Sequence, residues 1–262
     1  MIKKITIIGS GNVATILGTA LFNSGYTING IWSRTFENAQ HLASKLKTFG
    51  ANLISQLPSN SDLYLIAVSD DAIETVAHQL SMEFGYNIFI AHTSGSFSTE
   101  ILAKYFNNYG VFYCLQTFTK DSILDFKKIP ILITASSYGD ENKLLKLAES
   151  ISDSTHLKND EQRKNIHLAA VFVNNFVNHM YTSAHEIMTN DQQEFNLLLP
   201  LIEETTLKIL EGKDPSKLQT GPAKRNDNKI IGNHLEMLEK YPLLSKIYLT
   251  LSNNIKEYYK RD

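Results

Sequence analysis

A glycine-rich turn between a short apolar run and an amphipathic segment is the feature that most constrains this chain. Residues 5–8, Ile5-Thr6-Ile7-Ile8, are all β-branched and, apart from Thr6, apolar, which is typical of a strand buried on both faces of a parallel sheet. The run ends in Gly9-Ser10-Gly11-Asn12-Val13-Ala14, and apolar residues then recur at helical spacing to residue 21. A strand, a glycine turn and a helix in this order are the context that a dinucleotide-binding turn requires.

The small residues of this turn have separate physical roles. Gly9 permits the tight turn, Gly11 lets the backbone approach a pyrophosphate, and Ala14 lets the helix pack closely on the strand. The helix N-terminus offers free N–H groups and a positive dipole end to the phosphates. We therefore predict a dinucleotide site at Gly9, Ser10, Gly11, Asn12 and Val13. The alternative is a glycine turn of a βαβ unit that binds no ligand.

The end of the second expected strand, residues 26–32, indicates which dinucleotide binds. An NAD-preferring site usually places an acid here, on the ribose hydroxyls. This strand ends instead in Ser33-Arg34-Thr35, two hydroxyls and a guanidinium, which suit a 2′-phosphate through charge-assisted hydrogen bonds. We therefore predict NADP(H) as the cofactor. The alternative is a solvated polar turn.

The composition excludes several classes of protein. A net charge of −2 without a large Lys/Arg cluster argues against a nucleic-acid partner. Cys114 is the only cysteine, so an intrachain disulfide and a thiolate metal cluster are excluded, which fits a reducing cytoplasm. No two histidines are three or four residues apart, and we expect no metal site. No stretch reaches the ~18 apolar residues of a membrane helix, so we expect a cytoplasmic protein without a membrane partner.

Short apolar runs alternate with helical patterns over the first part of the chain. We expect strands at residues 5–8, 26–32, 52–54, 62–68, 87–91, 111–115 and 129–133. Between and after them we expect helices that include residues 37–49, 98–106 and 139–151. Strands that alternate with helices predict an α/β fold with a doubly wound, Rossmann-like sheet.

The pattern changes after residue 152, where a polar, turn-rich stretch is followed by no further strong strand. Residues 160–189 read as one long helix, and helices follow at residues 196–211, 226–240 and 243–260. We therefore divide the chain into an N-terminal nucleotide-binding domain, residues 1–153, and a C-terminal all-helical domain, residues 154–262. The long helix is apolar over more than one face, which requires burial by neighbouring helices or by a second subunit.

Open α/β sheets bind ligands at the carboxyl ends of their strands. We therefore place Val68 and Ser69, which end the fourth strand, beside the cofactor ribose; the following Asp70 is alternatively a helix N-cap. The fifth strand leads into His92-Thr93-Ser94-Gly95, which we expect to face the nicotinamide end.

Two residues of this loop are candidates for chemistry. An imidazole titrates near neutrality, so His92 is a candidate to pass a proton to a carbonyl or imine; alternatively it hydrogen-bonds its own loop. Ser94 donates to a substrate oxygen, or it turns the loop. Gln116 ends the sixth strand at the same edge and is a candidate substrate ligand.

Five stretches, taken together and in order, resemble a known family. They are Ile7-Ile8-Gly9-Ser10-Gly11-Asn12-Val13-Ala14, Trp32-Ser33-Arg34, His92-Thr93-Ser94-Gly95, Gln116-Thr117-Phe118 and Thr220-Gly221-Pro222-Ala223-Lys224-Arg225-Asn226-Asp227. The combination resembles proteins that join a Rossmann-like domain to a helical domain of unassigned function, DUF2520. Their layout is similar to that of pyrroline-5-carboxylate reductase, F420-dependent NADP oxidoreductase and the 6-phosphogluconate dehydrogenase superfamily. The resemblance covers nearly the whole chain and implies an NADP-dependent oxidoreductase, a homodimer built through the helical domain, but no particular substrate.

The resemblance also suggests roles for residues of the long helix. Hydroxyacid dehydrogenases of the superfamily carry a catalytic lysine three residues before an asparagine pair. Asn174-Asn175 resembles that pair, which makes Asn174 a catalytic candidate, but Val171 stands where the lysine is expected. Lysine-assisted alcohol oxidation is therefore not transferable. His167 lies seven residues before Asn174 on the expected helical face, so it is a candidate substrate ligand or a polar core histidine.

The segment that begins at Thr220 carries two bases, Lys224 and Arg225, before an apolar helix. These bases are candidates to bind a substrate carboxylate or phosphate, or they form a basic, solvated turn. A hydroxyl- and glycine-rich segment at a similar place completes the site of pyrroline-5-carboxylate reductase, so the resemblance makes Thr220 a catalytic candidate.

These observations favour an NADP(H)-dependent oxidoreductase. Its substrate would be a small anionic imine or a carbonyl or alcohol compound, held in a cleft between the domains. The alternative is a non-catalytic nucleotide-binding sensor or assembly protein, which Val171 and the uncertain base leave open.

Overall fold

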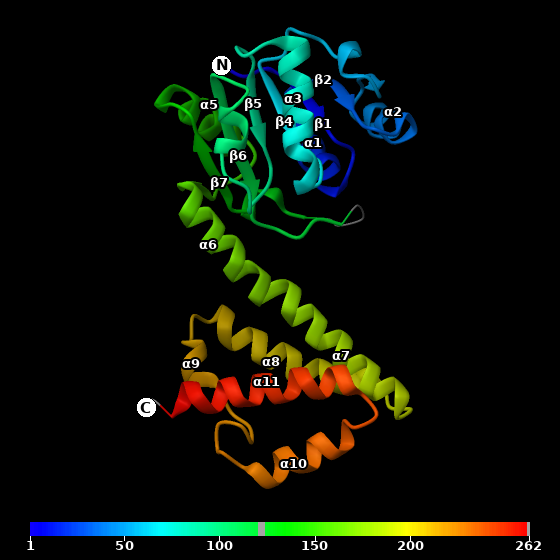
Figure 1. The fold of residues 1–262 in the computed structure, drawn as a ribbon, viewed down its shortest axis with the longest axis vertical. Helices are drawn as coiled ribbons and strands as arrows, with labels where there is room; N and C mark the ends of the chain where they lie inside the picture. Colours follow the sequence, from blue (N-terminus) through cyan, green and yellow to red (C-terminus); the bar gives the residue numbers. More distant parts are fainter. Residues whose placement is uncertain (120–123, 261–262) are drawn as a thin grey trace. The chain divides into compact units, whose positions relative to one another are not determined.

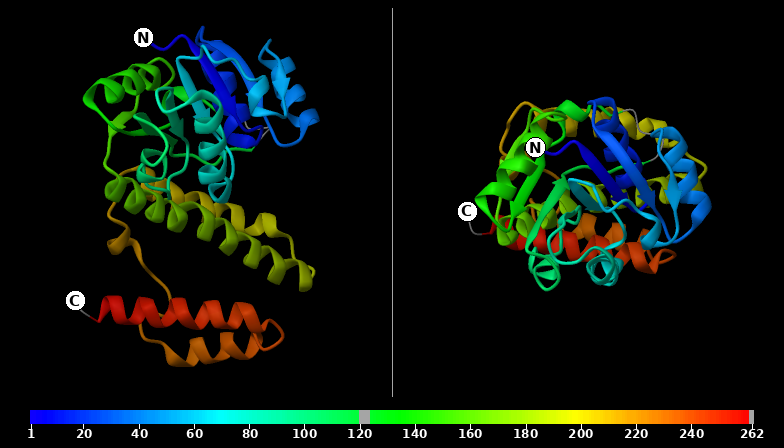
Figure 2. Two further views of the ribbon diagram at one scale, coloured as in Figure 1. Left: turned by 45° about the horizontal axis from the view of Figure 1, so that its top comes forward. Right: turned by 90° about the horizontal axis from the view of Figure 1, so that it is seen from above.

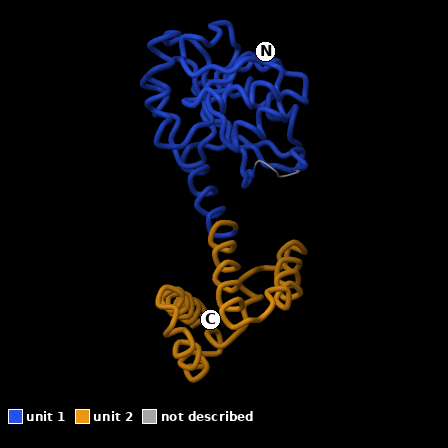
Figure 3. Tube along the Cα trace, turned by 90° about the vertical axis from the view of Figure 1, so that its right-hand side faces the viewer, with its two compact units in different colours: residues 1–173 blue, residues 174–262 orange. Residues whose placement is uncertain are grey.

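The computed structural model describes residues 1–119 and 124–260 and divides the chain into two compact units, Met1–Val173 and Asn174–Asp262 (Figure 3). The first unit contains a mainly parallel sheet with helices, and the second is mostly helical, so the expected fold class is confirmed. The first unit extends past residue 153 because one more strand and one more helix belong to it.

The described part of the first unit contains one eight-stranded sheet with the order β3-β2-β1-β4-β5-β6-β7-β8 (Figure 1). Its strands are β1 (Lys4–Ile8), β2 (Thr27–Trp32), β3 (Gly50–Ala51), β4 (Leu63–Ile66), β5 (Phe89–His92), β6 (Asn108–Cys114), β7 (Ile131–Ala135) and β8 (Thr155–Leu157). Every neighbouring pair is parallel except β6 and β7, which are antiparallel. The strand order reverses between β1 and β4, which is where doubly wound sheets bind ligands.

Helices cover both faces of the sheet (Figures 1 and 2). They are α1 (Asn12–Asn23), α2 (Phe36–Lys45), α3 (Ile73–Phe84), α4 (Glu100–Ala103) and α5 (Tyr138–Glu149), and α6 (Asp160–Ala170) follows β8 and leads away from the end of the sheet. Ile7 and Leu65 pack with α1, α2 and α5, whereas their chain neighbours Ile8 and Ile66 pack with α3 and α4. Successive strand residues point to opposite faces, and burial on both faces explains the uninterrupted apolar runs; each fully buried Ile or Leu contributes roughly 1.5–3 kcal/mol.

The expected third strand at residues 52–54 is wrong. Strand β3 comes earlier, at Gly50–Ala51, and Ile54–Gln56 forms a 3-10 turn. Gly50 lies against the backbone of α2, since an added Cβ would come within 2.6 Å of the Gln40 nitrogen. The helix expected at residues 37–49 therefore ends at Lys45, and Lys47 takes the left-handed conformation that follows it.

Two other elements differ from the expected pattern. The helix expected at residues 98–106 is reduced to the single turn α4. Residues after 152 were expected to contain no strong strand, but β8 pairs in parallel with β7. The β8 sequence, Thr155-His156-Leu157, is polar and exposed at the edge, so it lacks the apolar run that identifies an inner strand.

Helix α6 is anchored to the sheet by a buried ion pair that sequence reasoning missed. The Arg163 side chain is fully buried and lies 2.7 Å from Asp160 Oδ1. Its guanidinium also donates to Thr134 Oγ1 on β7 (2.7 Å) and to the carbonyl oxygen of Phe97. Asp160 Oδ2 in turn accepts from the Ser98 hydroxyl and from the Thr99 nitrogen (2.9 Å). One charge pair therefore joins β7, the chain before α4 and the first turn of α6.

The long helix expected at residues 160–189 is not α-helical throughout. A π-helical segment, Val171–Phe176, separates α6 from α7 (Val177–Asn190). The remaining helices of the second unit are α8 (Leu199–Leu210), α9 (Pro215–Leu218), α10 (Asn228–Met237) and α11 (Pro242–Tyr259). Helices α10 and α11 lie side by side, joined by a 2.8 Å hydrogen bond between His234 Nδ1 and Tyr248 Oη (Figure 2). In the described chain no helix has both the length and the apolar character to cross a membrane.

We predict that Asp160→Asn destabilises the protein by about 3 kcal/mol, because it leaves the buried Arg163 guanidinium unpaired. Chemical denaturation at pH 7 measures this change. The matched control is Asp153→Asn, since the Asp153 carboxylate is 77% exposed and pairs with the exposed Lys127. The control should leave the denaturation midpoint nearly unchanged. Equal midpoints for both variants would contradict the anchoring role.

The same variant should show a defined pH dependence. Burial opposes ionisation of Asp160, but hydrogen bonds from Ser98, Arg163 and Thr99 outweigh it and hold the pKa of Asp160 below its usual range. A carboxylate with a lowered folded-state pKa stabilises the protein above its unfolded-state pKa, about 3.9, and loses that effect as the pH falls through the folded-state value. The stability difference between wild type and Asp160→Asn should therefore be full at pH 6 and shrink below about pH 4.

Candidate functional site

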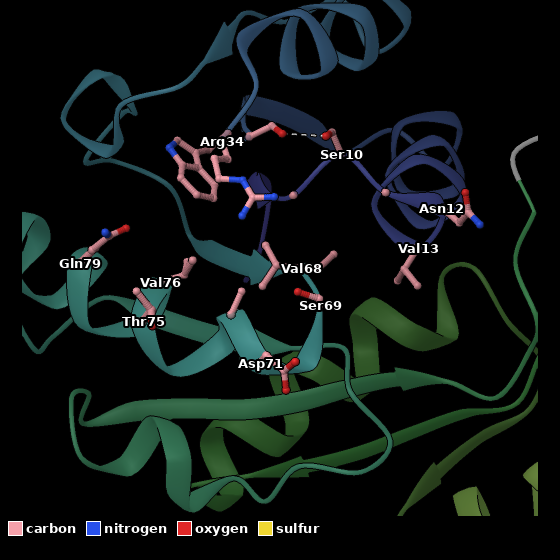
Figure 4. Close-up of a pocket in the computed structure, with 16 residues that line it drawn as sticks. Ser10, Asn12, Val13, Arg34, Val68, Ser69, Asp71, Thr75, Val76 and Gln79 are labelled. Carbon is pink, nitrogen blue, oxygen red and sulfur yellow. Dashed lines mark hydrogen bonds between the residues drawn. The ribbon is translucent and has the colours of Figure 1, made fainter.

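A pocket of about 770 Å³ lies at the carboxyl ends of β1, β2 and β4 (Figure 4). Its lining comes from the glycine turn, the ends of β2 and β4, and the start of α3: Gly9, Ser10, Gly11, Asn12, Val13, Trp32, Ser33, Arg34, Ala67, Val68, Ser69, Asp71, Ala72, Thr75, Val76 and Gln79. The pocket therefore coincides with the reversal of strand order between β1 and β4. In Figure 4, Ser10 and Arg34 lie along one side, across from Val68, Ser69 and Asp71.

The two glycines of the turn are constrained differently. Gly9 has a φ of 129°, and an added Cβ would lie 2.2 Å from the Ala67 carbonyl oxygen, so the protein's own backbone requires this glycine. Gly11 has an ordinary φ of −75°, and an added Cβ would meet no atom within 4 Å. Because Gly11 lines the pocket, the space that its missing side chain leaves is available to a ligand.

The N-terminus of α1 is suited to an anion. Gly11 is its N-cap, no side chain accepts a hydrogen bond from the first N–H groups, and the first turn contains no acid. The helix dipole and these N–H groups therefore favour a phosphate at the pocket wall. The pocket thus fits the pyrophosphate of a dinucleotide, whose ligands in the protein would be the backbone groups of Gly11, Asn12 and Val13.

The end of β2 presents two of the three residues predicted to bind a 2′-phosphate. Ser33 and Arg34 line the pocket, and the Ser10 hydroxyl donates to Ser33 Oγ at 2.8 Å. Arg34 is exposed, so its guanidinium is accessible to an anion. Thr35 does not line the pocket; it is the N-cap of α2.

The wall opposite contains residues that sequence reasoning missed. Val68 and Ser69, which we predict to lie beside the cofactor ribose, line the pocket, and Ser69 rather than Asp70 is the N-cap of the following turn. Five further lining residues, Asp71, Ala72, Thr75, Val76 and Gln79, come from the first part of α3 and the turn before it. The last three recur at helical spacing directly after a ligand-binding strand end, which is a signal that could have identified them.

The side chain of His92 is buried in the protein and contacts its own loop. His92 is fully buried, its Nδ1 accepts from the Ser94 nitrogen (3.2 Å), and its Nε2 lies 3.4 Å from the Ser98 carbonyl oxygen. Burial, followed by the nearby Arg163 charge, lowers the pKa of His92 to about 4. His92 is therefore neutral at pH 7, and the geometry favours the alternative in which it hydrogen-bonds its own loop.

Ser94 also supports the loop. Its Oγ accepts from the backbone nitrogens of Ser96 (3.1 Å) and Phe97 (3.2 Å), and the residue is 7% exposed. This is the geometry of the alternative in which Ser94 turns the loop. Gln116 is exposed, and its Oε1 accepts from the Thr117 nitrogen at 2.8 Å.

His167 lies against the sheet, where it contacts a residue that sequence reasoning missed. Its Nδ1 is 2.9 Å from Tyr113 Oη, and the two rings meet edge to face. Gly95 packs against both, because an added Cβ would lie 2.7 Å from His167 Nδ1 and 2.7 Å from Tyr113 Cζ. Tyr113 carried no motif signal, since it stands within an apolar strand.

The remaining predicted residues belong to the second unit. Asn174 lies in the π-helical segment, so its seven-residue spacing from His167 is not the α-helical spacing on which a shared face was expected. Thr220, Lys224 and Arg225 are exposed, and Lys224 Nζ lies 4.8 Å from the centre of the Tyr259 ring. Their predicted roles stay predictions. Within the described residues, no three His, Cys, Asp or Glu side chains gather as a metal site would require.

Comparisons with known proteins assign both parts of the chain. Residues 4–95 match the family described as NADP oxidoreductase, coenzyme F420-dependent, and residues 129–255 match DUF2520, a domain of unknown function. A candidate NADP oxidoreductase from Bacteroides fragilis is 38% identical, with 97% of this chain and 98% of that chain covered and a TM-score of 0.90. No protein with a curated description matches the chain.

Two more distant structures share the fold. A Thermotoga maritima protein is 23% identical, with 98% of each chain covered and a TM-score of 0.68. A reductive aminase from Aspergillus terreus, in complex with NADPH and ethyl levulinate, is 15% identical, with 100% of this chain and 95% of that chain covered and a TM-score of 0.70.

We predict opposite phenotypes for alanine at the two glycines. Gly11→Ala should stay within about 1 kcal/mol of wild-type stability, because its φ suits alanine and the space is open. It should weaken dinucleotide binding at least ~10-fold, since the methyl group would occupy the place of a phosphate. Gly9→Ala should lower the unfolding midpoint strongly. Thermal unfolding and NADPH titration measure the two properties, and undiminished NADPH affinity in Gly11→Ala would contradict the assignment of the turn.

Proposed function

The chain belongs to the family that joins an N-terminal F420-dependent NADP oxidoreductase domain to a C-terminal DUF2520 domain, and we propose that it is an NADP(H)-dependent reductase of a small anionic imine or carbonyl compound. The observation that carries the proposal is the wall of the pocket, where Gly11 leaves open space beside the uncapped N-terminus of α1. A pocket with this wall accepts a pyrophosphate, and its volume suits a ligand larger than a simple anion.

NADPH bound there would supply a hydride for reduction. The N–H groups that begin α1 would hold the pyrophosphate. Ser10, Ser33 and Arg34 would hold the 2′-phosphate, because they offer two hydroxyls already oriented by their mutual hydrogen bond and one accessible guanidinium. Val68 and Ser69 would lie beside the ribose at the end of β4.

Reduction is favoured over alcohol oxidation. Val171 stands where superfamily members that oxidise hydroxyacids carry a lysine base, and His92 is buried and engaged within its loop. The Aspergillus terreus reductive aminase, whose fold this chain shares, forms a complex with NADPH and ethyl levulinate. An imine or carbonyl substrate is consistent with that fold. The exposed pair Lys224 and Arg225 is our candidate ligand for the anionic group of the substrate.

We predict that the purified protein binds NADPH in preference to NADH and that Arg34→Ala removes this preference. Loss of charge-assisted hydrogen bonds to the 2′-phosphate costs roughly 1.5–3 kcal/mol, which corresponds to about 10- to 150-fold in Kd. A fluorescence titration of both proteins with both cofactors measures the effect.

NADH serves as the internal control, because it lacks the 2′-phosphate and its affinity should change less than about threefold in Arg34→Ala. Equal affinity of wild type for NADPH and NADH would contradict the cofactor assignment. Absence of binding of either would contradict the function itself.

A second candidate is a nucleotide-binding sensor without turnover. The buried, neutral His92 and the valine at position 171 favour it, because neither supplies the acid or base that turnover would need. The two functions differ in one property. A reductase oxidises bound NADPH when supplied with 2-oxo acids or cyclic imines, whereas a sensor binds NADPH and leaves it reduced.

We also propose that a second copy of the chain covers helices of the second unit. No side chain of α7 or α8 is buried among the described residues, although both helices are amphipathic. Leu197, Leu201 and Leu210 are 68%, 66% and 76% exposed. Apolar surface of this extent is typical of an interface that a partner buries.

We predict that wild type sediments as a dimer and that Leu210→Glu weakens the dimer at least tenfold, since a buried carboxylate opposes association. Analytical ultracentrifugation over a concentration series measures the dissociation constant. Met82→Glu is the matched control, because Met82 is also 76% exposed and helical but lies on α3 in the first unit. A monomeric wild type would contradict the proposal.

A further inference from the structure

The Tyr113–His167 pair lies at the same edge of the sheet as the dinucleotide pocket. Strand pairing places Ile8, Ile66, His92 and Val111 in one row across β1, β4, β5 and β6. Beyond this row β1, β4 and β5 end, whereas β6 continues to Cys114, so Tyr113 lies two residues further toward the carboxyl end of β6. The pocket lies at the carboxyl ends of β1 and β4, and Tyr113 is therefore at the same edge of the sheet, on the β6 side.

A dinucleotide at this edge would direct its reactive half toward the pair. The two mononucleotide halves of a doubly wound sheet lie on either side of the strand reversal, here between β1 and β4. The predicted 2′-phosphate ligands Ser33 and Arg34 are on the β2 side. The nicotinamide half would therefore lie on the side of β4, β5 and β6, where Gly95 packs directly against Tyr113 and His167.

The surroundings of Tyr113 keep its phenol protonated. Burial, then the adjacent Cys114, raise the pKa of Tyr113 to about 12, with Arg163 opposing and Asp70 adding to the shift. His167 is the other titratable group in contact with it. The phenol is therefore protonated at neutral pH, and because it is a weaker acid than an ordinary tyrosine, its proton would pass to an atom that becomes strongly basic as the hydride arrives.

We propose that Tyr113 donates the proton to the substrate oxygen or nitrogen during reduction and that His167 restores it. This proposal rests on the proposed function. It adds the acid that the buried His92 does not supply.

A bound dihydronicotinamide would supply a hydride to the substrate carbon, and the π pair of the C=O or C=N bond would move onto the oxygen or nitrogen. That atom takes the Tyr113 Oη proton. The tyrosinate takes a proton from His167 Nδ1, and Nε2 takes one from solvent, so the imidazole ends in its other tautomer. The substrate is reduced by two electrons, and NADPH becomes NADP+.

The contrasting explanation is that the pair only fixes α6 to the sheet. The second unit contains the same kind of pair, His234 and Tyr248, with a 2.8 Å hydrogen bond and rings 5.6 Å apart, against 2.9 Å and 5.7 Å for Tyr113 and His167. Tyr248→Phe therefore removes an equivalent hydrogen bond from a pair for which we propose no chemistry, and it is the matched control.

The first test requires no substrate. Full-length protein is labelled at Cζ of its twelve tyrosines, and the carbon signal of Tyr113 is assigned by its loss in Tyr113→Phe. We expect this signal to differ between the NADPH and NADP+ complexes, because the positive charge of oxidised nicotinamide would lie beside the phenol, and the Tyr248 signal to stay constant. A Tyr113 signal that is identical in the two complexes would overturn the proposal and leave the proposed function intact. Absence of NADPH binding would overturn both.

The second test measures single-turnover NADPH oxidation with a panel of 2-oxo acids and cyclic imines. We expect Tyr113→Phe to lower the rate at least ~100-fold, the usual contribution of a general acid, with NADPH affinity within about twofold of wild type. Tyr248→Phe should stay within about twofold for both. A Tyr113→Phe rate equal to wild type would overturn the proposal. If wild type reduces no compound of the panel, the proposal is tested by the Tyr113 Cζ signal of the first experiment.

One more variant covers the case in which Tyr113→Phe does not fold. Gly95→Ala retains both rings but places a methyl group 2.7 Å from His167 Nδ1 and from Tyr113 Cζ, which forces the pair apart. We expect a rate loss with NADPH affinity retained. Unchanged rates in a folded Gly95→Ala whose Tyr113 signal has moved would overturn the proposal.

Discussion

A guanidinium cannot be buried without partners, and the arrangement of the first unit follows from how Arg163 meets this requirement. Leaving such a charge unpaired is strongly destabilising. Asp160 neutralises it, Thr134 and Phe97 accept its hydrogen bonds, and Ser98 and Thr99 complete the shell around Asp160. Because these partners come from β7, from the chain before α4 and from α6, the start of α6 is fixed relative to the sheet. The position of His167, one turn later on the same helix, and its contact with Tyr113 depend on that attachment. The same charge contributes to the neutrality of His92.

The sequence predicted those helices and strands that are determined by residues close to one another in the chain. The run at residues 5–8 is apolar on both faces because helices cover both faces, and the glycine turn and α1 follow from spacing and residue size. Strand β3 was misplaced because it has two residues and depends on Gly50 packing against the α2 backbone, a tertiary contact. Strand β8 was missed because a polar edge strand has no apolar alternation. The π-helical turn at Val171–Phe176 has no composition that distinguishes it from an α-helix, so a single long helix was the natural expectation.

The candidate site likewise contains residues that the sequence could predict and residues that it could not. The sequence could predict four residues of the pocket wall: Gly9, Gly11, Ser33 and Arg34. A phosphate site built from a turn and a strand end consists of residues that are adjacent in the sequence, so a short motif identifies it. The orientation of His92 could not, because in a strand covered on both faces inward and outward positions are equally buried, and no alternation marks which side a histidine faces. Tyr113 and His167 were not linked beforehand because their contact joins residues far apart in the chain through the glycine at position 95. The residues of α3 that line the pocket carry a recognisable signal, because they recur at helical spacing directly after the end of a ligand-binding strand.

Gly9 and Gly11 stand two residues apart but are constrained by different partners. A side chain at Gly9 collides with the protein's own Ala67 carbonyl, so it raises the unfolded fraction, and cells degrade unfolded chains. A side chain at Gly11 meets open space in the free protein and collides only with what binds there. In a genetic screen that scores protein abundance, substitutions at Gly9 would therefore be depleted and Gly11→Ala would pass unnoticed. A parallel screen for activity would detect both positions, so the difference between the two screens would identify the residues constrained by the ligand.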